Sequence, residues 1–91
     1  MSQACQLSVV IPVYNEERRL GNTLKRLEEY FANQSYKWEL VVVDDGSSDR
    51  SVEIARRSGL GEALKIVSHE VNRGKGAAVR TGMMESSGAY A

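Results

Sequence analysis

The segment Trp38-Glu-Leu-Val-Val-Val-Asp-Asp-Gly-Ser-Ser-Asp49 decides the fold class of this chain. Its first part, Trp38 to Val43, is mostly apolar and ends in three valines, which is typical of a strand buried on both faces of a parallel sheet. The acidic and small residues 44–49 stop this run abruptly and predict a turn. Ser48 or Asp49 is then suited to cap a helix. We therefore expect a buried strand that ends in a polar loop and passes directly into a helix.

A similar pattern precedes this segment. Leu7 to Val13 is a β-branched run that predicts another buried strand, in which Pro12 lacks a backbone donor and should end the ladder. Residues 12–16 should then form a loop, with Asn15 as a cap for the next helix. The apolar residues of that amphipathic helix recur at helical spacing: Leu20, Leu24, Leu27 and Phe31.

The alternation continues after the segment. A second helix has a modest apolar side at Val52, Ile54 and Ala55, and Gly59 or Gly61 should end it. The remaining expected elements are a weaker strand at Leu64–Ser68, a loop at residues 72–76, a helix at Ala77–Ser86 with Val79 and Met83 one turn apart, and the start of a fourth strand at Gly88–Ala91.

The order of these elements predicts an α/β, Rossmann-like fold. Strands that alternate with helices indicate a mostly parallel sheet with right-handed crossovers and helices on both faces. We expect residues 1–6 to form an N-terminal tail and residues 7–91 to form one unit. That unit is expected to be incomplete at its C-terminus, because the alternation stops at a strand that is only begun.

Composition excludes several classes of partner. The 91 residues carry a formal net charge of zero, so no general field attracts nucleic acid or an anionic membrane. Cys5 is the only cysteine, which rules out an internal disulfide and two-cysteine metal motifs and fits a reduced, cytoplasmic setting. The N-terminus lacks the basic flank of a secretory signal, and the apolar run Leu7–Val13 is too short to cross a bilayer.

Polar segments follow each of the three predicted strands: residues 12–16, 44–49 and 72–76. Because ligands of open α/β sheets bind beyond the carboxyl ends of the strands, we expect these segments to form one site. Asp44 and Asp45 follow three valines directly, and a carboxylate at a strand end can accept hydrogen bonds from a ligand. The structural alternative is that Asp44 holds the turn and Asp45 begins an Asx-turn before Gly46.

Single residues in the other two segments also have alternatives. Tyr14 offers an aromatic face for a flat ring such as a nucleobase, or it packs on the first helix. Glu16 is favoured in a first helical turn by the helix dipole. Lys75, between two glycines and before a helix, offers a charge to a phosphate. The pattern around Lys75 is neither a Walker loop nor a dinucleotide fingerprint. His69, the only histidine, is expected to be a packing or surface residue.

Three segments together resemble family 2 glycosyltransferases, which are inverting enzymes of the GT-A fold. They are Ser8-Val-Val-Ile-Pro-Val-Tyr-Asn-Glu, Val41-Val-Val-Asp-Asp-Gly-Ser-Ser-Asp and Asn72-Arg-Gly-Lys-Gly-Ala-Ala-Val-Arg-Thr-Gly. The chain looks most similar to the branch of dolichyl-phosphate glucosyltransferases and polyprenyl-phosphate mannosyltransferases. The resemblance runs from about Leu7 to Ala91.

The resemblance implies a nucleotide-sugar donor of the UDP-glucose or GDP-mannose type and a lipid-phosphate or other acceptor. It implies that the nucleotide pocket is formed by Pro12, Tyr14 beside the base, Glu16, Val43 and Asp45 at the base and ribose edge, and Lys75 near the diphosphate or base. It implies membrane association of a longer chain through its acceptor or C-terminal segments. The base, the sugar, the acceptor and the oligomeric state stay open at this point.

The resemblance also implies a divalent metal, Mg²⁺ or Mn²⁺. The family's Asp-x-Asp metal motif and its catalytic base are expected beyond Ala91, so we expect no catalytic or metal-ligating residue in this chain and no transfer by these residues alone. The alternative is a non-catalytic nucleotide-binding module of the same fold.

Two other strand-end acid chemistries fit less well. An aspartyl-phosphate phosphatase needs two aspartates separated by one residue, whereas the adjacent Asp44 and Asp45 point in opposite directions. A flavodoxin-like phosphoacceptor domain needs an acidic pair after the first strand and an aspartate after the third. Here the first strand is followed by Tyr14-Asn-Glu and the third by His69-Glu.

Overall fold

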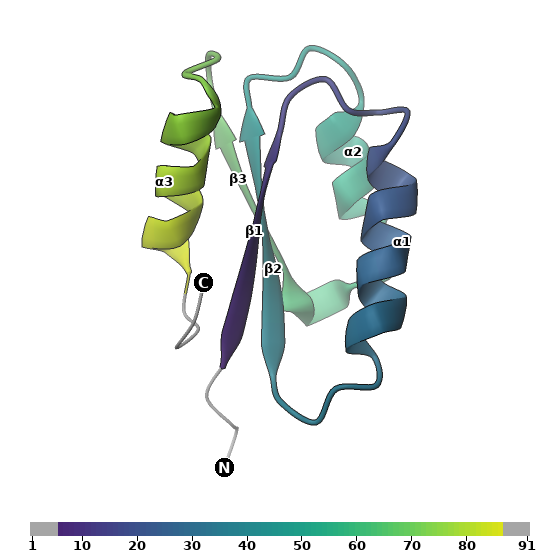
Figure 1. Cartoon of the computed structure of the whole chain (residues 1–91). Coiled ribbons are helices and arrows are strands. Elements are labelled where there is room, and N and C mark those ends of the chain that lie inside the picture. The colour runs from purple at the N-terminus through teal and green to yellow at the C-terminus, as the bar shows by residue number, and fades with distance from the viewer. Residues whose placement is uncertain (1–5, 87–91) are drawn as a thin grey trace.

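The structure is a computed structural model that describes residues 6–86 as a three-stranded parallel sheet between two helical layers (Figure 1). Its elements in chain order are β1 (Leu7–Val13), α1 (Leu20–Phe31), β2 (Trp38–Asp45), α2 (Ser51–Arg56), the 3₁₀ helix η1 (Gly61–Ala63), β3 (Leu64–His69) and α3 (Lys75–Glu85). The strand order is β1-β2-β3. Helices α1 and α2 cover one face of the sheet and α3 covers the other. The predicted α/β, Rossmann-like fold is confirmed.

The central strand β2 is buried on both faces. Leu40 and Val42 face α1 and α2, where they pack in a cluster with Leu24. Val41 and Val43 alternate with them and pack on the opposite face against α3. Because side chains alternate along a strand, a run of consecutive apolar residues is what two covered faces require. The apolar run in the sequence therefore correctly predicted that β2 is a strand buried on both faces.

Helix α1 is amphipathic, as its spacing predicted. Leu20, Leu24 and Phe31 are buried, and Leu27 packs partly buried against the same core. Phe31 also stacks on Trp38 at the start of β2, with ring centroids 4.8 Å apart. Within residues 6–86, no helix has the length and apolar character that a membrane span needs.

Helix α3 approaches the sheet through small residues. Ala78 and Gly82 are its buried positions, whereas Met83 is 55% exposed. A Cβ atom built on Gly82 would lie 2.2 Å from Val10 Cγ1, so the helix backbone rests almost directly on β1. The spacing of Val79 and Met83 therefore does not mark the buried side of this helix.

All three strands run further than predicted, β3 by the single residue His69. Pro12 does not end the ladder, because β1 continues to Val13 and Pro12 lies opposite Val43. Among the described strands β1 has one neighbour, and a residue without an amide donor is tolerated on such a strand. Strand β2 includes Asp44 and Asp45, the second of which lies beside His69 of β3. The two aspartates are thus part of the sheet and not of the turn.

The predicted start of α1 was wrong in detail. Asn15 does not cap this helix, which begins after Arg19 without a side-chain cap. Asn15 has a positive φ of 51°, and its Oδ1 accepts the backbone N–H of Ser48 instead. Asparagine tolerates this left-handed conformation better than most residues, which explains its place in the loop.

The other helix ends differ by a few residues from the predictions. Neither Ser48 nor Asp49 is the cap of α2, because Arg50 precedes the helix and makes no side-chain cap; Asp49 Oδ1 instead accepts the backbone N–H of Ser51, the first helical residue. Helix α2 ends at Arg56, before either predicted glycine. Helix α3 begins at Lys75, which removes two residues from the predicted loop. The predicted fourth strand at Gly88–Ala91 lies outside the described residues.

Candidate functional site

The loops that follow β1 and β2 are joined by hydrogen bonds at the carboxyl edge of the sheet, at the top of Figure 1. Asn15 donates its backbone N–H to Ser47 Oγ at 2.9 Å and accepts from the Ser48 backbone at 2.9 Å. Glu17 donates its backbone N–H to Asp49 Oδ2 at 3.1 Å. These contacts hold the first two polar segments together, as the sheet-edge argument predicted.

The loop after β3 packs against the loop after β2 at Gly46. Gly46 has a φ of 77°, which residues with a side chain rarely adopt. A Cβ atom there would lie 2.6 Å from the backbone nitrogen of Asn72 and 2.8 Å from the carbonyl carbon of Val71. A glycine is therefore required for the third segment to reach the other two.

A cleft of about 370 Å³ lies where the three segments meet. It is lined by Pro12, Val13, Tyr14, Glu16, Asp45, Asn72, Lys75 and Ala78. Five of the six residues predicted for the nucleotide pocket are in this lining. They come from the ends of β1 and β2, the β1–α1 loop and the first turn of α3, so residues far apart in sequence form one concave surface.

Val43 is the exception. It is 0% exposed and packs with Val41 and Ala78 beneath α3. Its side chain therefore does not line the cleft, and its contribution is to seat α3 on the sheet next to Asp45. A direct side-chain contact between Val43 and a nucleotide has no support in this arrangement.

Asp45 is held by three hydrogen bonds. Its Oδ1 accepts from His69 Nδ1 at 2.7 Å and from the backbone N–H of Arg73 at 2.8 Å, and its Oδ2 accepts from the backbone N–H of Gly74 at 2.8 Å. The hydrogen bond from His69 and then that from Arg73 lower the pKa of Asp45, against the opposing effect of burial. Asp45 is 3% exposed, and its carboxylate lies at the edge of the cleft.

Asp44 has a different environment from Asp45. Its side chain points to the α1 and α2 side of the sheet, as that of Val42 does, because side chains two residues apart on a strand share a face. Its Oδ2 accepts the backbone N–H of Ser47 at 3.3 Å, and its buried Oδ1 has no hydrogen-bond partner among residues 6–86. Asp44 thus holds the turn after β2, whereas Asp45 lies on the other face of the sheet and lines the cleft.

His69 is the residue that the sequence analysis missed. It is not a surface residue or simple packing: it is 8% exposed, and both ring nitrogens have partners, Asp45 on one side and Thr81 Oγ1 at 2.9 Å on the other. In a parallel pair, residues in register point to the same face of the sheet, and Asp45 is in register with His69. That register, unlike the amino-acid pattern, would have identified the pair.

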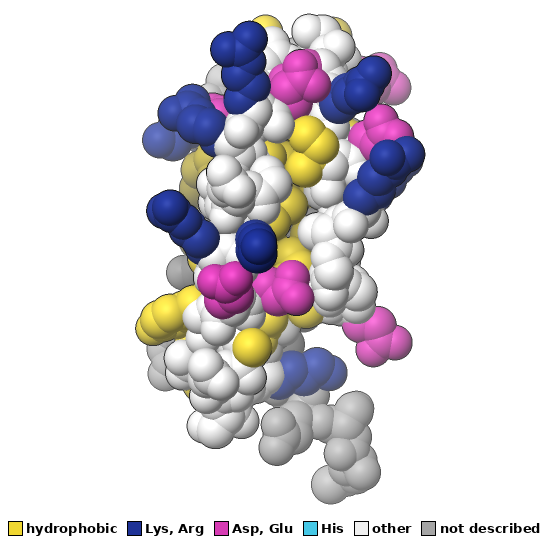
Figure 2. Space-filling view, turned by 90° about the vertical axis from the view of Figure 1, so that its right-hand side faces the viewer, with side chains coloured by type: hydrophobic (Ala, Val, Ile, Leu, Met, Phe, Trp, Pro, Cys, Tyr) yellow, Lys and Arg dark blue, Asp and Glu magenta, His cyan; other side chains and the backbone are white. Residues whose placement is uncertain are grey.

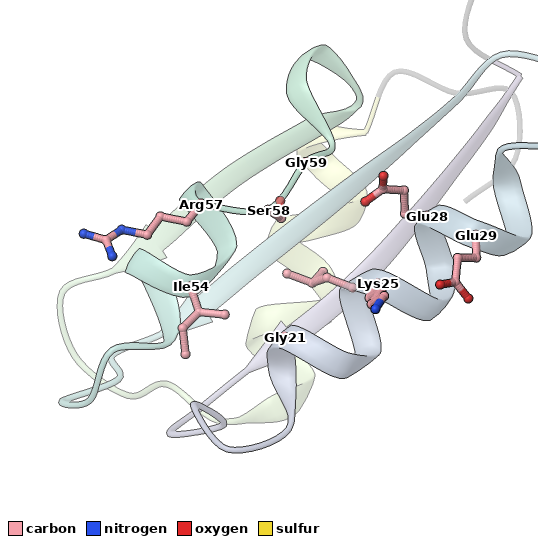
Figure 3. A pocket seen from close by; sticks show the side chains of 9 residues that line it. Gly21, Lys25, Glu28, Glu29, Ile54, Arg57, Ser58 and Gly59 are labelled. Atoms are coloured by element: carbon pink, nitrogen blue, oxygen red, sulfur yellow. The ribbon is translucent and has the colours of Figure 1, made fainter.

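A larger cavity, of about 530 Å³, lies between α1 and α2 on the opposite side of the sheet. Figure 2 shows this face, with hydrophobic side chains along a central groove and charged side chains on both sides. In Figure 3, Arg57 points away from the cavity and Glu28 points toward Gly59. The charged groups do not converge on one point, and none of the predicted site residues lies here. The smaller cleft is therefore the better candidate.

The described residues offer no obvious metal centre. Within residues 6–86, no three His, Cys, Asp or Glu side chains come close enough to hold a metal ion. The described residues therefore do not fit a divalent metal by themselves.

Comparison with known proteins places this geometry in a family. The model of the family described as "Glycosyl transferase family 2" matches residues 8–91. Dodecaprenyl-phosphate galacturonate synthase of Rhizobium johnstonii is 38% identical over 90 residues, which cover 94% of this chain and 26% of the relative. Dolichyl-phosphate beta-glucosyltransferase of Drosophila melanogaster is 36% identical over 96 residues, which cover 96% of this chain and 29% of the relative.

Solved structures show the same fold. S. aureus TarS (residues 1–349) matches with a TM-score of 0.78 and 28% identity, over 94% of this chain and 26% of that one. Mannosyltransferase PcManGT from Pyrobaculum calidifontis, solved in complex with GDP-Man and Mn²⁺, matches with a TM-score of 0.69 and 27% identity, over 93% of this chain and 25% of that one. Both are glycosyltransferases of the GT-A fold. The chain spans less than a third of the length of these proteins.

Proposed function

The chain belongs to glycosyl transferase family 2, and from that premise we propose that its cleft binds the nucleotide of a nucleotide-sugar donor. The observation that carries the proposal is the meeting of Tyr14, Asp45 and Lys75 around one cleft at the carboxyl edge of a parallel sheet. An aromatic ring can stack on a base. An anionic acceptor can bind the donors on the edge of the base or on the ribose, and a cation can bind the diphosphate.

Each of these residues has a distinct proposed role. Tyr14 is half exposed and stacks on the base, because the face of an aromatic ring binds a flat heterocycle. Asp45 Oδ2 accepts one backbone N–H and can accept a second donor from the base or ribose. Lys75 lies in the first turn of α3, where its charge and the helix dipole both favour a diphosphate. Pro12 and Glu16 complete the wall of the cleft.

The proposed reaction of the longer protein is inverting transfer of a hexose from a UDP-glucose or GDP-mannose type donor to a lipid phosphate or another acceptor. Relatives named for dolichyl-phosphate glucosyl transfer and dodecaprenyl-phosphate galacturonate synthesis support a lipid-phosphate acceptor. The GDP-Man and Mn²⁺ of the mannosyltransferase structure support a nucleotide-sugar and a divalent metal. An acceptor of this kind would bring the longer protein to a membrane surface.

The part played by these 91 residues in that reaction is proposed to be donor binding. Residues 6–86 bring no set of metal ligands together, so we expect the electrostatic support of the diphosphate from this part of the chain to come from Lys75 and the start of α3. We expect the 91 residues alone to bind nucleotide without transferring sugar. Turnover of UDP-glucose or GDP-mannose by the purified 91-residue chain would overturn that expectation.

Calorimetric titration of the 91-residue chain with UDP, GDP and the matching nucleosides tests the binding proposal. Lys75→Ala should weaken diphosphate binding roughly tenfold and leave nucleoside binding unchanged, because the lost charge faces only the phosphates. Lys25→Ala is the matched control, since Lys25 lines the other cavity. Asp45→Asn should weaken both classes of ligand. The proposal fails if no nucleotide binds, or if Lys25→Ala weakens binding as much as Lys75→Ala.

A further inference from the structure

A buried chain of hydrogen bonds connects β2, β3 and α3 behind the cleft. His69, at the end of β3, bridges Asp45 of β2 and Thr81 of α3 through its two ring nitrogens. His69 is not among the residues that line the cleft, whereas Asp45 is. A ligand in the cleft would therefore contact Asp45 but not the residue that orients it.

The chemistry of the carboxylate shows which nitrogen of His69 must carry a hydrogen. The Asp45 carboxylate only accepts hydrogen bonds, so His69 Nδ1 carries a hydrogen and donates it to Oδ1. Nε2 lies 2.9 Å from Thr81 Oγ1, and a hydroxyl can donate or accept in such a hydrogen bond. The imidazole ring is thus held in one orientation from both sides.

This arrangement leaves one side of the Asp45 carboxylate open. Oδ1 accepts from both His69 and Arg73, which occupies the acceptor positions of that oxygen. Among residues 6–86, Oδ2 accepts only from the Gly74 backbone, so its other acceptor position is available to a ligand. Rotation of the carboxylate out of its present plane would move both oxygens away from their donors, and the hydrogen bond from His69 opposes that rotation.

We propose that His69 is a positioning residue for the donor nucleotide: it holds the Asp45 carboxylate in one orientation and ties it, through Thr81, to the helix that carries Lys75. This inference rests on the proposed function of the cleft. It assigns to His69 a role in affinity without contact with the ligand. It also couples the two ends of the bound nucleotide, because His69 and Thr81 join Asp45 to α3, the helix that begins at Lys75.

Two substitutions at position 69 separate this role from simple packing. The side-chain amide nitrogen of asparagine can take the place of Nδ1, whereas that of glutamine takes the place of Nε2. His69→Asn should therefore keep the donor to Asp45 and hold the affinity for UDP or GDP within about threefold, and His69→Gln should weaken it about tenfold. Packing alone predicts the opposite order, because glutamine is closer to histidine in size.

A second pair of variants tests the link to α3. Thr81→Val keeps the shape of the side chain and removes the hydroxyl, while Thr81→Ser keeps the hydroxyl. Thr81→Val should weaken nucleotide affinity severalfold and Thr81→Ser should not. This pair tests whether the hydrogen bond between His69 and Thr81 contributes to affinity, even if a variant at position 69 fails to fold. Equal affinity of the Thr81→Val and Thr81→Ser variants would overturn it.

A readout without nucleotide distinguishes failure of this inference from failure of the proposed function. The Asp45 carboxyl carbon can be followed by NMR during an acid titration of the 91-residue chain. Its pKa should stay low in His69→Asn and rise toward the ordinary value in His69→Gln, because the hydrogen bond from His69 is the main cause of the lowering. If the unmodified chain binds neither UDP nor GDP, the proposed function fails, and this titration still decides whether His69 orients Asp45. The same Asp45 pKa in both variants overturns the positioning role.

Discussion

Gly82 of α3 lies so close to Val10 of β1 that no side chain fits between them. A Cβ atom at position 82 would be 2.2 Å from Val10 Cγ1 and 3.0 Å from Val43 Cγ2. Both neighbours are β-branched residues whose methyl groups have little freedom to move. The contact sets the distance between α3 and the sheet, and with it the position of the first turn of α3 beside the cleft.

Gly82→Ala is therefore expected to be destabilising although alanine favours helices. Overpacking of this kind costs about 1–3 kcal/mol of unfolding free energy. Gly76→Ala is the matched control in the same helix, because a Cβ atom there meets nothing within 4 Å. It should stabilise the chain by about 0.5–1 kcal/mol. Urea unfolding of the two variants checks the prediction, which is wrong if both substitutions change stability in the same direction.

Gly46→Ala should be more damaging than Gly61→Ala. Both glycines have positive φ, 77° and 57°, so each substitution incurs a backbone cost of about 1–2 kcal/mol. Only at Gly46 would the new Cβ atom also meet backbone, at 2.6 Å from Asn72 N, whereas nothing lies within 4 Å of Gly61. The difference in melting temperature between the two variants measures how tightly the loops after β2 and β3 are packed. Equal melting temperatures would show that the loops separate at little cost.

Asp49 should make stability depend on pH. The hydroxyl of Ser51 donates to Asp49 Oδ1, and this hydrogen bond is the main cause of the lowered Asp49 pKa. A group whose folded pKa is lowered stabilises the fold fully above its unfolded value of about 4, and this stabilisation is lost as the pH falls through the folded value. Asp49→Asn should thus be less stable than the unmodified chain near neutral pH, and the difference should shrink in acid.

Unfolding curves of the unmodified chain and Asp49→Asn from about pH 6 to about pH 2 check this expectation. Ser51→Ala should reduce the same pH dependence, because it removes the donor while leaving the carboxylate. A stability difference that stays constant across the range would mean that Asp49 does not carry the effect.

Tyr14→Ala should weaken nucleotide binding. Stacking of a base on an aromatic ring contributes about 1–3 kcal/mol, which corresponds to a loss of roughly five- to 150-fold in affinity. Tyr30→Ala is the control, because Tyr30 is also exposed, 63% against 50% for Tyr14, but lies on α1 and outside the cleft lining. Titration with UDP and GDP should show a loss for the first variant alone. If Tyr30→Ala has the same effect as Tyr14→Ala, stacking in this cleft is not the cause.

The sequence pattern was sufficient wherever a local rule governs the structure. The consecutive valines before Asp44 predict a strand that is buried on both faces, as observed for β2. The spacing of Leu20 and Leu24 requires a helix with one buried side, as observed for α1. The meeting of Tyr14 and Lys75 at one cleft follows from a general property of parallel sheets, that all carboxyl ends lie at the same edge.

Features that depend on a neighbouring element could not be predicted in this way. Whether Pro12 ends a strand depends on how many neighbours that strand has. The side of α3 that is buried depends on where the sheet accepts a helix, which is why Gly82 and not Met83 faces the core. The partner of His69 depends on the register between β2 and β3, which no local pattern of residues contains.

The opposite directions of Asp44 and Asp45 make the cleft sensitive to strand alignment. A slip of β2 by a single residue would turn Asp45 toward α1 and α2 and bring Asp44 to the α3 side, with net charge and composition unchanged. After such a slip, the Asp45 carboxylate would no longer occupy the position from which it now accepts hydrogen bonds from the backbone of Gly74 and the ring of His69. A one-residue insertion or deletion within β2 would therefore abolish ligand recognition even in a chain that still forms a sheet. The cleft thus requires one particular register of β2, the one in which Asp45 and not Asp44 lies on the α3 side.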